Sequence, residues 1–268
     1  MNFKKRGLFT GSKAVCEEPS MPEKGILAVW GSPGCGKTLA SIKLAQHLAS
    51  KKQNVLLVLC DMTTPMLPCV CPNSQVDTER SMGNVLVTEK MNQTLIKHNL
   101  TTLKKYKNLV ILAMRKGENE HSYPAPTQEQ AEALLTALRE TAPYVIVDCS
   151  SYISSDVLSF VTLMLADHVL RLANVDLKSV SYFSGQNHLL RAENWDAGKQ
   201  YKIASNVKPN QTQEQIYNSI GEVAFKLPYS TELEGQFLAG TLLDTLQMKD
   251  GRAYDKEIAR ISKEVFGC

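Results

Sequence analysis

The sequence lacks several features that would each have pointed to a particular class of protein. No apolar run approaches the ~20 residues of a membrane-spanning helix. The basic start, MNFKKRG, is not followed by the apolar stretch of a signal peptide. The 30 basic and 27 acidic residues nearly cancel, so no large electric field favours nucleic acid or anionic lipid as a partner. We therefore expect a cytoplasmic protein.

The cysteines also lack a pattern. Seven of them are scattered along the chain, and an odd number without a regular spacing is typical of a reducing compartment. Cys69 and Cys71 form the only close pair, and no further metal ligands accompany them in the sequence. This pattern favours free thiols over a zinc site.

Short apolar runs alternate with helical stretches along most of the chain. The runs are apolar throughout, as in strands buried on both faces of a parallel sheet. We therefore expect an α/β fold with a doubly wound, mostly parallel sheet of seven or eight strands and helices on both faces. Residues 1–23 are expected to form a flexible arm, and residues 24–268 a single P-loop domain. The candidate strands are residues 26–30, 55–60, 109–114, 144–148, 169–173, 202–205 and 223–227.

Helix starts are marked by capping signals. A T-x-x-Q spacing, typical of a capping box, occurs at residues 127–130 and again at residues 212–215. Asp176 can cap a further helix that runs to residue 190.

The stretch GSPGCGKT fits the phosphate-loop pattern G-x-x-x-x-G-K-[ST]. It follows an apolar strand and precedes a helix, which is the context in which this pattern binds phosphate. Backbone N–H groups and the helix N-terminus attract phosphate oxygens there. Lys37 is expected to reach the β- and γ-phosphates, and Thr38 to bind Mg²⁺. The expected phosphate-binding residues are Gly31, Ser32, Pro33, Gly34, Cys35, Gly36, Lys37, Thr38 and Leu39.

Two candidate strands end in aspartate. Asp148 follows four apolar residues, as in a Walker B motif, and is expected to hold Mg²⁺ directly or through water. Asp61 follows the second strand, where it can orient a water or bind a metal-ligated one. A turn-forming role is the alternative for Asp61, and a capping role for Asp148. Together with Lys37, the two aspartates are the expected catalytic residues.

Two further regions are expected to contact the nucleotide. Residues 62–83 contain three prolines and no strong periodicity, which favours a switch loop beside the γ-phosphate. Asn206 ends a strand and carries both a donor and an acceptor for adenine, whereas the acid of the guanine-binding N-K-x-D motif is missing. Pro228 and Tyr229 begin a loop that can lie along the base.

These segments together resemble the ParA/MinD-like ATPases of the SIMIBI class of P-loop proteins. The resemblance spans roughly residues 24–250, with LCDMTTP as first switch, VIVDCSS as Walker B, SNVKPN as base loop and LPYSTELEGQFLAG as closing segment. The CpaE/TadZ-like pilus-assembly branch is the most similar in pattern. The resemblance implies ATP and Mg²⁺ as cofactors, a nucleotide-dependent homodimer, a protein partner, and work as a positioning or assembly switch.

One position departs from that family. Most members carry a second lysine where this chain has Ser32, and that lysine reaches the partner's phosphates across the dimer. A cation delivered to the transition state is worth on the order of 10³–10⁵ in rate. We therefore expect firm ATP binding with slow hydrolysis. Ser32→Lys would restore the cation only if a nucleotide-bound dimer forms and the loop tolerates the lysine beside Pro33, so unchanged turnover in that variant would be ambiguous.

Three other interpretations remain. A SIMIBI-type small-molecule kinase or ATP-dependent synthetase would need basic substrate-binding residues, and residues 62–83 offer only Arg80. A DNA-partition ATPase would need a basic surface, but the basic run at residues 97–107 is more typical of a solvated helix and turn. The C-terminal stretch is amphipathic with balanced charges, which favours contact with the domain over membrane attachment.

Overall fold

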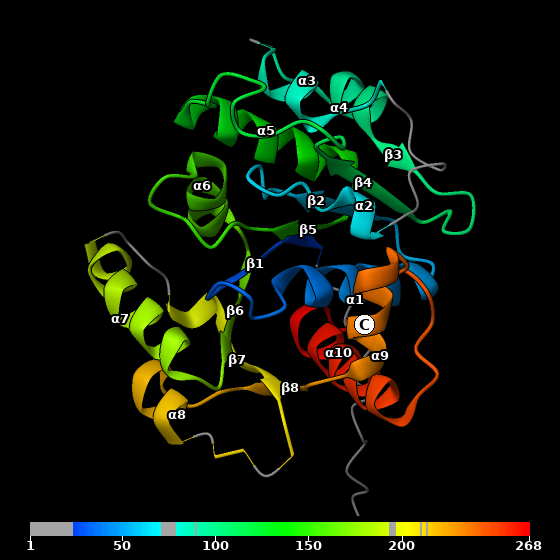
Figure 1. Ribbon diagram of the computed structural model, residues 1–268. Coiled ribbons are helices and arrows are strands. Elements are labelled where there is room, and N and C mark those ends of the chain that lie inside the picture. Colours follow the sequence, from blue (N-terminus) through cyan, green and yellow to red (C-terminus); the bar gives the residue numbers. More distant parts are fainter. Residues whose placement is uncertain (1–23, 71–78, 89, 193–196, 210, 213) are drawn as a thin grey trace, which may run out of the picture.

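The computed structural model describes residues 24–70, 79–88, 90–192, 197–209, 211–212 and 214–268. Its centre is an eight-stranded sheet in the order β3-β4-β2-β5-β1-β6-β7-β8 (Figure 1). All neighbouring strands run parallel except β3, which is antiparallel to β4 at one edge. The strands are β1 (Gly25–Gly31), β2 (Val55–Leu59), β3 (Thr101–Thr102), β4 (Leu109–Ala113), β5 (Tyr144–Asp148), β6 (His168–Asn174), β7 (Gln200–Val207) and β8 (Phe225–Pro228).

Helices cover both faces of this sheet, as the sequence predicts. On one face lie α1 (Lys37–Ser50), α2 (Leu67–Val70), α9 (Thr231–Ala239) and α10 (Lys249–Phe266). On the other lie α3 (Met82–Leu86), α4 (Gln93–Asn99), α5 (Gln128–Thr141), α6 (Val157–Leu165), α7 (Leu177–Ala192) and α8 (Glu214–Ile220). The doubly wound α/β fold expected from the sequence is confirmed.

The central strands supply side chains to both hydrophobic cores. In β1, Leu27 and Val29 belong to the core under α1 and α10, whereas Ile26, Ala28 and Trp30 belong to the core under α5 and α7. All five are fully buried. This alternation explains why the strand reads as a continuous apolar run, because a parallel strand has no solvent-facing side.

The predicted strands lie where strands are observed, but most of them begin or end at a different residue. Residues 144–148 match β5, and the other expected strands differ from the observed ones by one or a few residues at an end. The edge strand β3 was not predicted, because two threonines in a polar stretch carry no apolar periodicity. Residues 62–83 are not a plain loop, since they contain α2 and the first residues of α3.

Two helix starts follow their predicted caps. Thr127 caps α5 with a complete capping box, in which Gln130 returns the hydrogen bond to the backbone of Thr127. The carboxylate of Asp176 accepts from the backbone of Ser179 at 2.7 Å at the start of α7. The box expected at residues 212–215 includes Gln213, and the expected arm includes residues 1–23, which both lie outside the described residues.

The C-terminal helix α10 packs on the domain along its apolar stripe. Ile258, Ile261, Val265 and Phe266 are buried there, and α10 contacts α1, β8 and α9. The contact predicted from the balanced charges is therefore observed. Among the described helices, none is long and apolar enough to cross a membrane.

Candidate functional site: a phosphate loop at the centre of the sheet

The glycine-rich stretch connects β1 to α1 as a tight loop. Gly34 and Gly36 have φ values of 76° and 81°, in the left-handed region that side chains with a Cβ rarely adopt. Gly36 is the N-cap residue of α1, and it lacks a side-chain cap, so the first N–H groups of α1 are left for a ligand. The loop thus has the backbone conformation that binds phosphate at a helix N-terminus.

Lys37, at the start of α1, points toward the loop after β5. Its Nζ donates to the Ser151 hydroxyl at 2.5 Å, and that hydroxyl donates to the carbonyl of Gly31 at 2.8 Å. Tyr182, on α7, donates to the carbonyl of Ser151 at 2.5 Å. The lysine expected to bind phosphate is therefore held beside the phosphate loop by the segment that follows the Walker B strand.

Asp148 ends β5 next to the same helix. Its carboxylate accepts from the hydroxyl of Thr38 at 2.6 Å and from that of Ser41 at 3.3 Å, and the residue is 2% exposed. Burial raises the pKa of Asp148 to about 6, although the hydrogen bond from Thr38 and the charge of Lys37 lower it. The carboxylate and hydroxyl expected to bind Mg²⁺ are thus in direct contact.

Asp61 lies after β2, in a turn of its own making. One carboxylate oxygen accepts from the backbone N–H groups of Thr63 at 3.1 Å and Thr64 at 2.9 Å. The other accepts from the hydroxyl of Thr64 at 2.9 Å. This is the turn-forming arrangement that the sequence left open as an alternative. Asp61 is also close enough to Asp148 for its charge to raise the pKa of that residue.

A cavity of about 480 Å³ lies beside the loop and brings the expected base-binding residues together. Leu39, Asn206, Pro228 and Tyr229 all line it, although they come from α1, β7, β8 and the segment after β8. Asn206 has a left-handed φ of 52°, and its amide donates to Asn174 Oδ1 at 2.8 Å and to the carbonyl of Gly34 at 3.4 Å. The volume lies within the range of small-molecule sites, about 300–1,000 Å³.

Some residues of this region escaped the sequence analysis. Asn174 ends β6 as Asn206 lies near the end of β7, so the rule that singled out strand-end polar residues could have found it. Ser41 and Ser151 give no signal in one sequence, because serines are common on helices and loops. The further lining residues of the cavity are Val175, Asp176, Lys208, Gln211, Ser230, Leu233, Glu234, Phe237 and Tyr254.

Ser32 occupies a closed position. Its side chain is fully buried, and its hydroxyl lies 2.7 Å from that of Ser179 on α7. Because the Ser32 side chain is fully buried against Ser179, a lysine there would have to displace α7 or the loop. This packing adds to the geometric limit already expected from Pro33, so Ser32→Lys is not a clean test of a missing cation.

The close cysteine pair, for which free thiols were expected, is only partly described. Cys69 is half-buried against the core under α1, and Cys71 lies outside the described residues. Within the described part of the chain, no group of three or more His, Cys, Asp and Glu side chains is arranged to hold a metal ion.

The residues at the loop nevertheless fit Mg²⁺ bound together with a nucleotide. Mg²⁺ at phosphate sites usually takes one or two protein oxygens, and phosphates and waters supply the rest. The Thr38 hydroxyl and the Asp148 carboxylate are such a pair of oxygens, at 2.6 Å from each other. This oxygen-only donor set suits a hard cation.

Comparison with known proteins identifies the family. The model of the family described as AAA domain matches residues 26–192. The chain belongs to this family. A search of the curated proteins found no match.

Solved structures share the fold of this AAA-domain chain. A ParA family ATPase from Chlorobium tepidum superposes with a TM-score of 0.73 at 14% identity, covering 89% of this chain and 97% of that one. MinD from Pyrococcus horikoshii, solved with Mg-ADP, gives 0.67 at 14% identity, covering 89% and 96%. MinD from Aquifex aeolicus in its complex with MinC gives 0.68 at 16% identity, covering 88% and 94%. The resemblance to ParA/MinD-like P-loop ATPases is thereby confirmed, whereas the pilus-assembly branch stays a prediction.

The raised pKa of Asp148 predicts an unusual dependence of stability on pH. An aspartate has a pKa of about 3.9 in an unfolded chain, so the folded state without nucleotide retains this proton up to about pH 6. The free energy of unfolding should therefore fall as the pH rises from about 4 to 6, by an amount on the order of 2–3 kcal/mol. In Asp148→Asn this loss should be absent.

Urea unfolding of the nucleotide-free protein between pH 4 and 8 measures the effect. Asp250→Asn is a matched control of opposite sign, because hydrogen bonds from Thr231 and its own helix N-terminus lower the pKa of Asp250 to about 2. Its contribution is present above about pH 4 and is lost as the pH falls. Parallel pH profiles for wild type and Asp148→Asn would contradict the prediction.

Proposed function

We propose that the protein is an Mg²⁺-dependent ATP-binding switch or scaffold that hydrolyses ATP slowly and serves in positioning or assembling a larger complex. The observation that carries this proposal is the convergence of Lys37, Thr38 and Asp148 at the phosphate loop, at the carboxyl ends of β1 and β5. In doubly wound sheets, ligands bind at the carboxyl ends of the strands.

The position of each site residue supports a specific role in binding or hydrolysing the nucleotide. Lys37 moves from Ser151 to the β- and γ-phosphates, which offer it stronger, charge-assisted hydrogen bonds. Thr38 and Asp148 hold Mg²⁺, which neutralises charge on the phosphates when bound. Asp61 keeps its turn and orients a water for attack on the γ-phosphate. Asn206, Pro228 and Tyr229 contact the base in the adjoining cavity.

Slow hydrolysis follows from the charges at the loop. Lys37 is the single cation within residues 31–38, and it serves ground state and transition state alike. Ser32 adds no charge and is closed off by Ser179. A partner that supplies a cation or reshapes the loop would then set the rate.

A nucleotide-dependent homodimer and a protein partner are part of this proposal. The Aquifex MinD structure contains MinC, so a chain of this fold can bind a second protein. We infer the same general arrangement for this chain, acting in the cytoplasm as one P-loop domain over residues 24–268.

ATP binding is the first test. Lys37→Ala should weaken Mg²⁺-dependent ATP binding by at least about tenfold, because one lost charge-assisted hydrogen bond costs about 1.5–3 kcal/mol and tenfold needs only about 1.4. Lys97→Ala, an exposed lysine on α4, is the control and should bind as the wild type does. Equal affinities for Lys37→Ala and wild type in calorimetry would rule out the assignment.

The base cavity predicts a preference for adenine. ATP should bind roughly ten- to a hundredfold more tightly than GTP, because an unpaired base edge in a closed pocket costs about 1–3 kcal/mol. Asn206→Gly should reduce this preference, and glycine rather than alanine keeps the left-handed backbone.

Competition binding with ATP and GTP measures the preference. Asn218→Ala, an exposed residue on α8, is the control and should leave it unchanged. If GTP competes as well as ATP against the wild type, the adenine assignment fails.

The turnover rate separates a switch from a working enzyme. The purified protein should hydrolyse ATP far more slowly than about 10 s⁻¹, a median enzyme rate, and Asp61→Asn and Asp148→Asn should abolish the remaining activity. Phosphate release with excess Mg-ATP measures it. A wild-type rate near that median without a partner would mean that another residue supplies the missing cation, and would contradict the switch proposal in favour of a working enzyme.

A further inference from the structure

A second cavity, of about 240 Å³, lies on the side of the sheet's carboxyl edge away from the base. It shares no lining residue with the first cavity. Its walls come from the segments that follow three adjacent strands: residues 62–63 after β2, residues 114–126 after β4 and residues 150–157 after β5. Leu86 of α3 closes it on one side.

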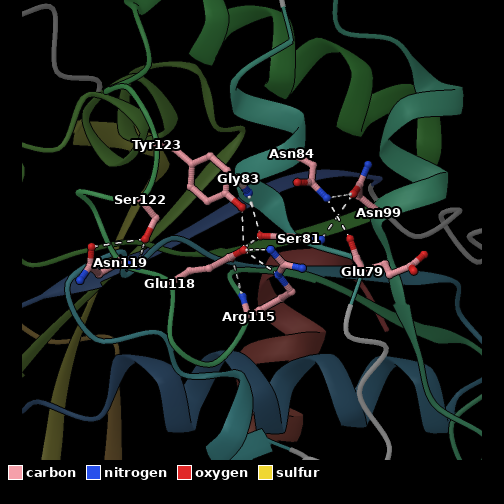
Figure 2. Close-up of polar contacts among 10 residues, drawn as sticks. All are labelled: Glu79, Ser81, Gly83, Asn84, Asn99, Arg115, Glu118, Asn119, Ser122 and Tyr123. Atoms are coloured by element: carbon pink, nitrogen blue, oxygen red, sulfur yellow. Dashed lines mark hydrogen bonds and ion pairs between the residues drawn. The ribbon is translucent and has the colours of Figure 1, made fainter.

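The β4 side of this cavity rests on the partly buried carboxylate of Glu118 (Figure 2). Glu118 accepts hydrogen bonds from Arg115 Nε at 2.6 Å, from the backbone of Arg115 at 3.0 Å, from Tyr123 at 2.6 Å and from Ser81. Ser81 also accepts from the backbone of Gly83 at 3.1 Å as the cap of α3. A Cβ on Gly83 would lie 2.0 Å from the Tyr123 ring, so this ring is seated against the helix backbone. The wall is therefore formed before any ligand arrives.

The other two walls of the cavity adjoin residues of the phosphate site. On the β2 side, the backbone of Glu120 donates to the carbonyl of Met62 at 2.9 Å, and Thr63 donates to the Glu120 carboxylate at 3.0 Å. Thr63 belongs to the turn that Asp61 forms. On the β5 side, Ser150 and Tyr152 flank Ser151, which holds Lys37. A ligand in this cavity would thus touch the turn that Asp61 forms and the segment that holds Lys37.

The size of the cavity and its exposed rim favour a side chain of a protein over a free small molecule. Small-molecule pockets usually measure about 300–1,000 Å³, so 240 Å³ is below their range. Tyr152 at the rim is 61% exposed, which leaves a large aromatic surface for a partner to cover. Interfaces commonly centre on one anchor side chain in a pocket with such contacts around it.

The charges select the chemistry of that partner. The charged lining residues are Glu120 and Asp156, both acidic. Asp156 is occupied as the cap of α6, where it accepts from Leu158, Ser159 and the Ser159 hydroxyl. The side chain of Glu120 is 48% exposed, so it can accept from an incoming cation, and the neighbouring His121 at 3.7 Å is largely exposed. The remaining lining includes Met62, Leu86, Met114, Tyr123 and Val157.

We propose that this cavity binds one apolar side chain of a protein partner, and that Glu120 pairs with a lysine or arginine beside that side chain in the partner's segment. The inference rests on the proposed function only for its link to nucleotide. Occupation of the cavity itself can be measured without ATP.

Peptides of random sequence provide the probe. A displayed library of twelve-residue peptides is selected on the full chain, and enriched peptides are synthesised and measured by fluorescence anisotropy. Ala125→Trp fills the cavity, and Ala253→Trp on the exposed side of α10 is the matched control. Glu120→Gln removes the charge, with Glu264→Gln on α10 as its control. Circular dichroism melting shows that each variant is folded, independently of nucleotide binding.

The expected peptides combine an apolar residue with an adjacent lysine or arginine. Ala125→Trp should weaken them by at least about tenfold, Glu120→Gln by about two- to fivefold, and both controls should bind as wild type does. Peptide binding that survives Ala125→Trp, a selection of acidic peptides, or no enrichment at all would overturn the proposal. If peptides bind as expected but ATP does not, the cavity assignment stands and the proposed function fails.

Discussion

A buried carboxylate at the centre of the sheet joins the fold to its chemistry. Asp148 ends the strand that lies between β1 and β2, and it contacts Thr38 and Ser41 on the helix that follows the phosphate loop. Burial opposes its charge and the hydroxyls partly offset that cost. The loop, the first helix and the central strand are therefore held together by the Asp148 carboxyl group. Its burial favours the protonated form, and a nearby cation favours the ionised form.

The same arrangement explains why binding sites gather at one edge of the molecule. Parallel strands place all their carboxyl ends on one side, and the segments after β1, β2, β4 and β5 meet there. The phosphate loop lies between the base cavity and the second cavity. Lys37 bridges to Ser151, and Tyr182 ties that segment to α7, so contacts at the loop extend to helices on the opposite face.

The sequence predicted what depends on local pattern. The phosphate loop, the apolar strands, the cap at Thr127 and the strand-end aspartate Asp148 each follow from a few adjacent residues, and the structure places them as expected. The short edge strand β3 has no such pattern, because its two residues are set by pairing with β4.

What depends on distant contacts could not be predicted. The closed environment of Ser32 requires Ser179, which is 147 residues away. The contact between Asn206 and Asn174 requires β6 and β7 to lie side by side. The second cavity is formed by the segments after three strands and by the hydrogen bonds that Glu118 accepts. No single stretch of the sequence therefore predicts it.

The hydroxyl pair of Ser32 and Ser179 also constrains how this chain can change over generations. Two small side chains fill one space, so the residue tolerated at either position depends on the residue at the other. A charged side chain at position 32 would fit only after α7 had changed near Ser179. A single substitution of Ser32 by a charged residue is therefore disfavoured by the neighbouring helix, and position 32 stays uncharged because of its surroundings.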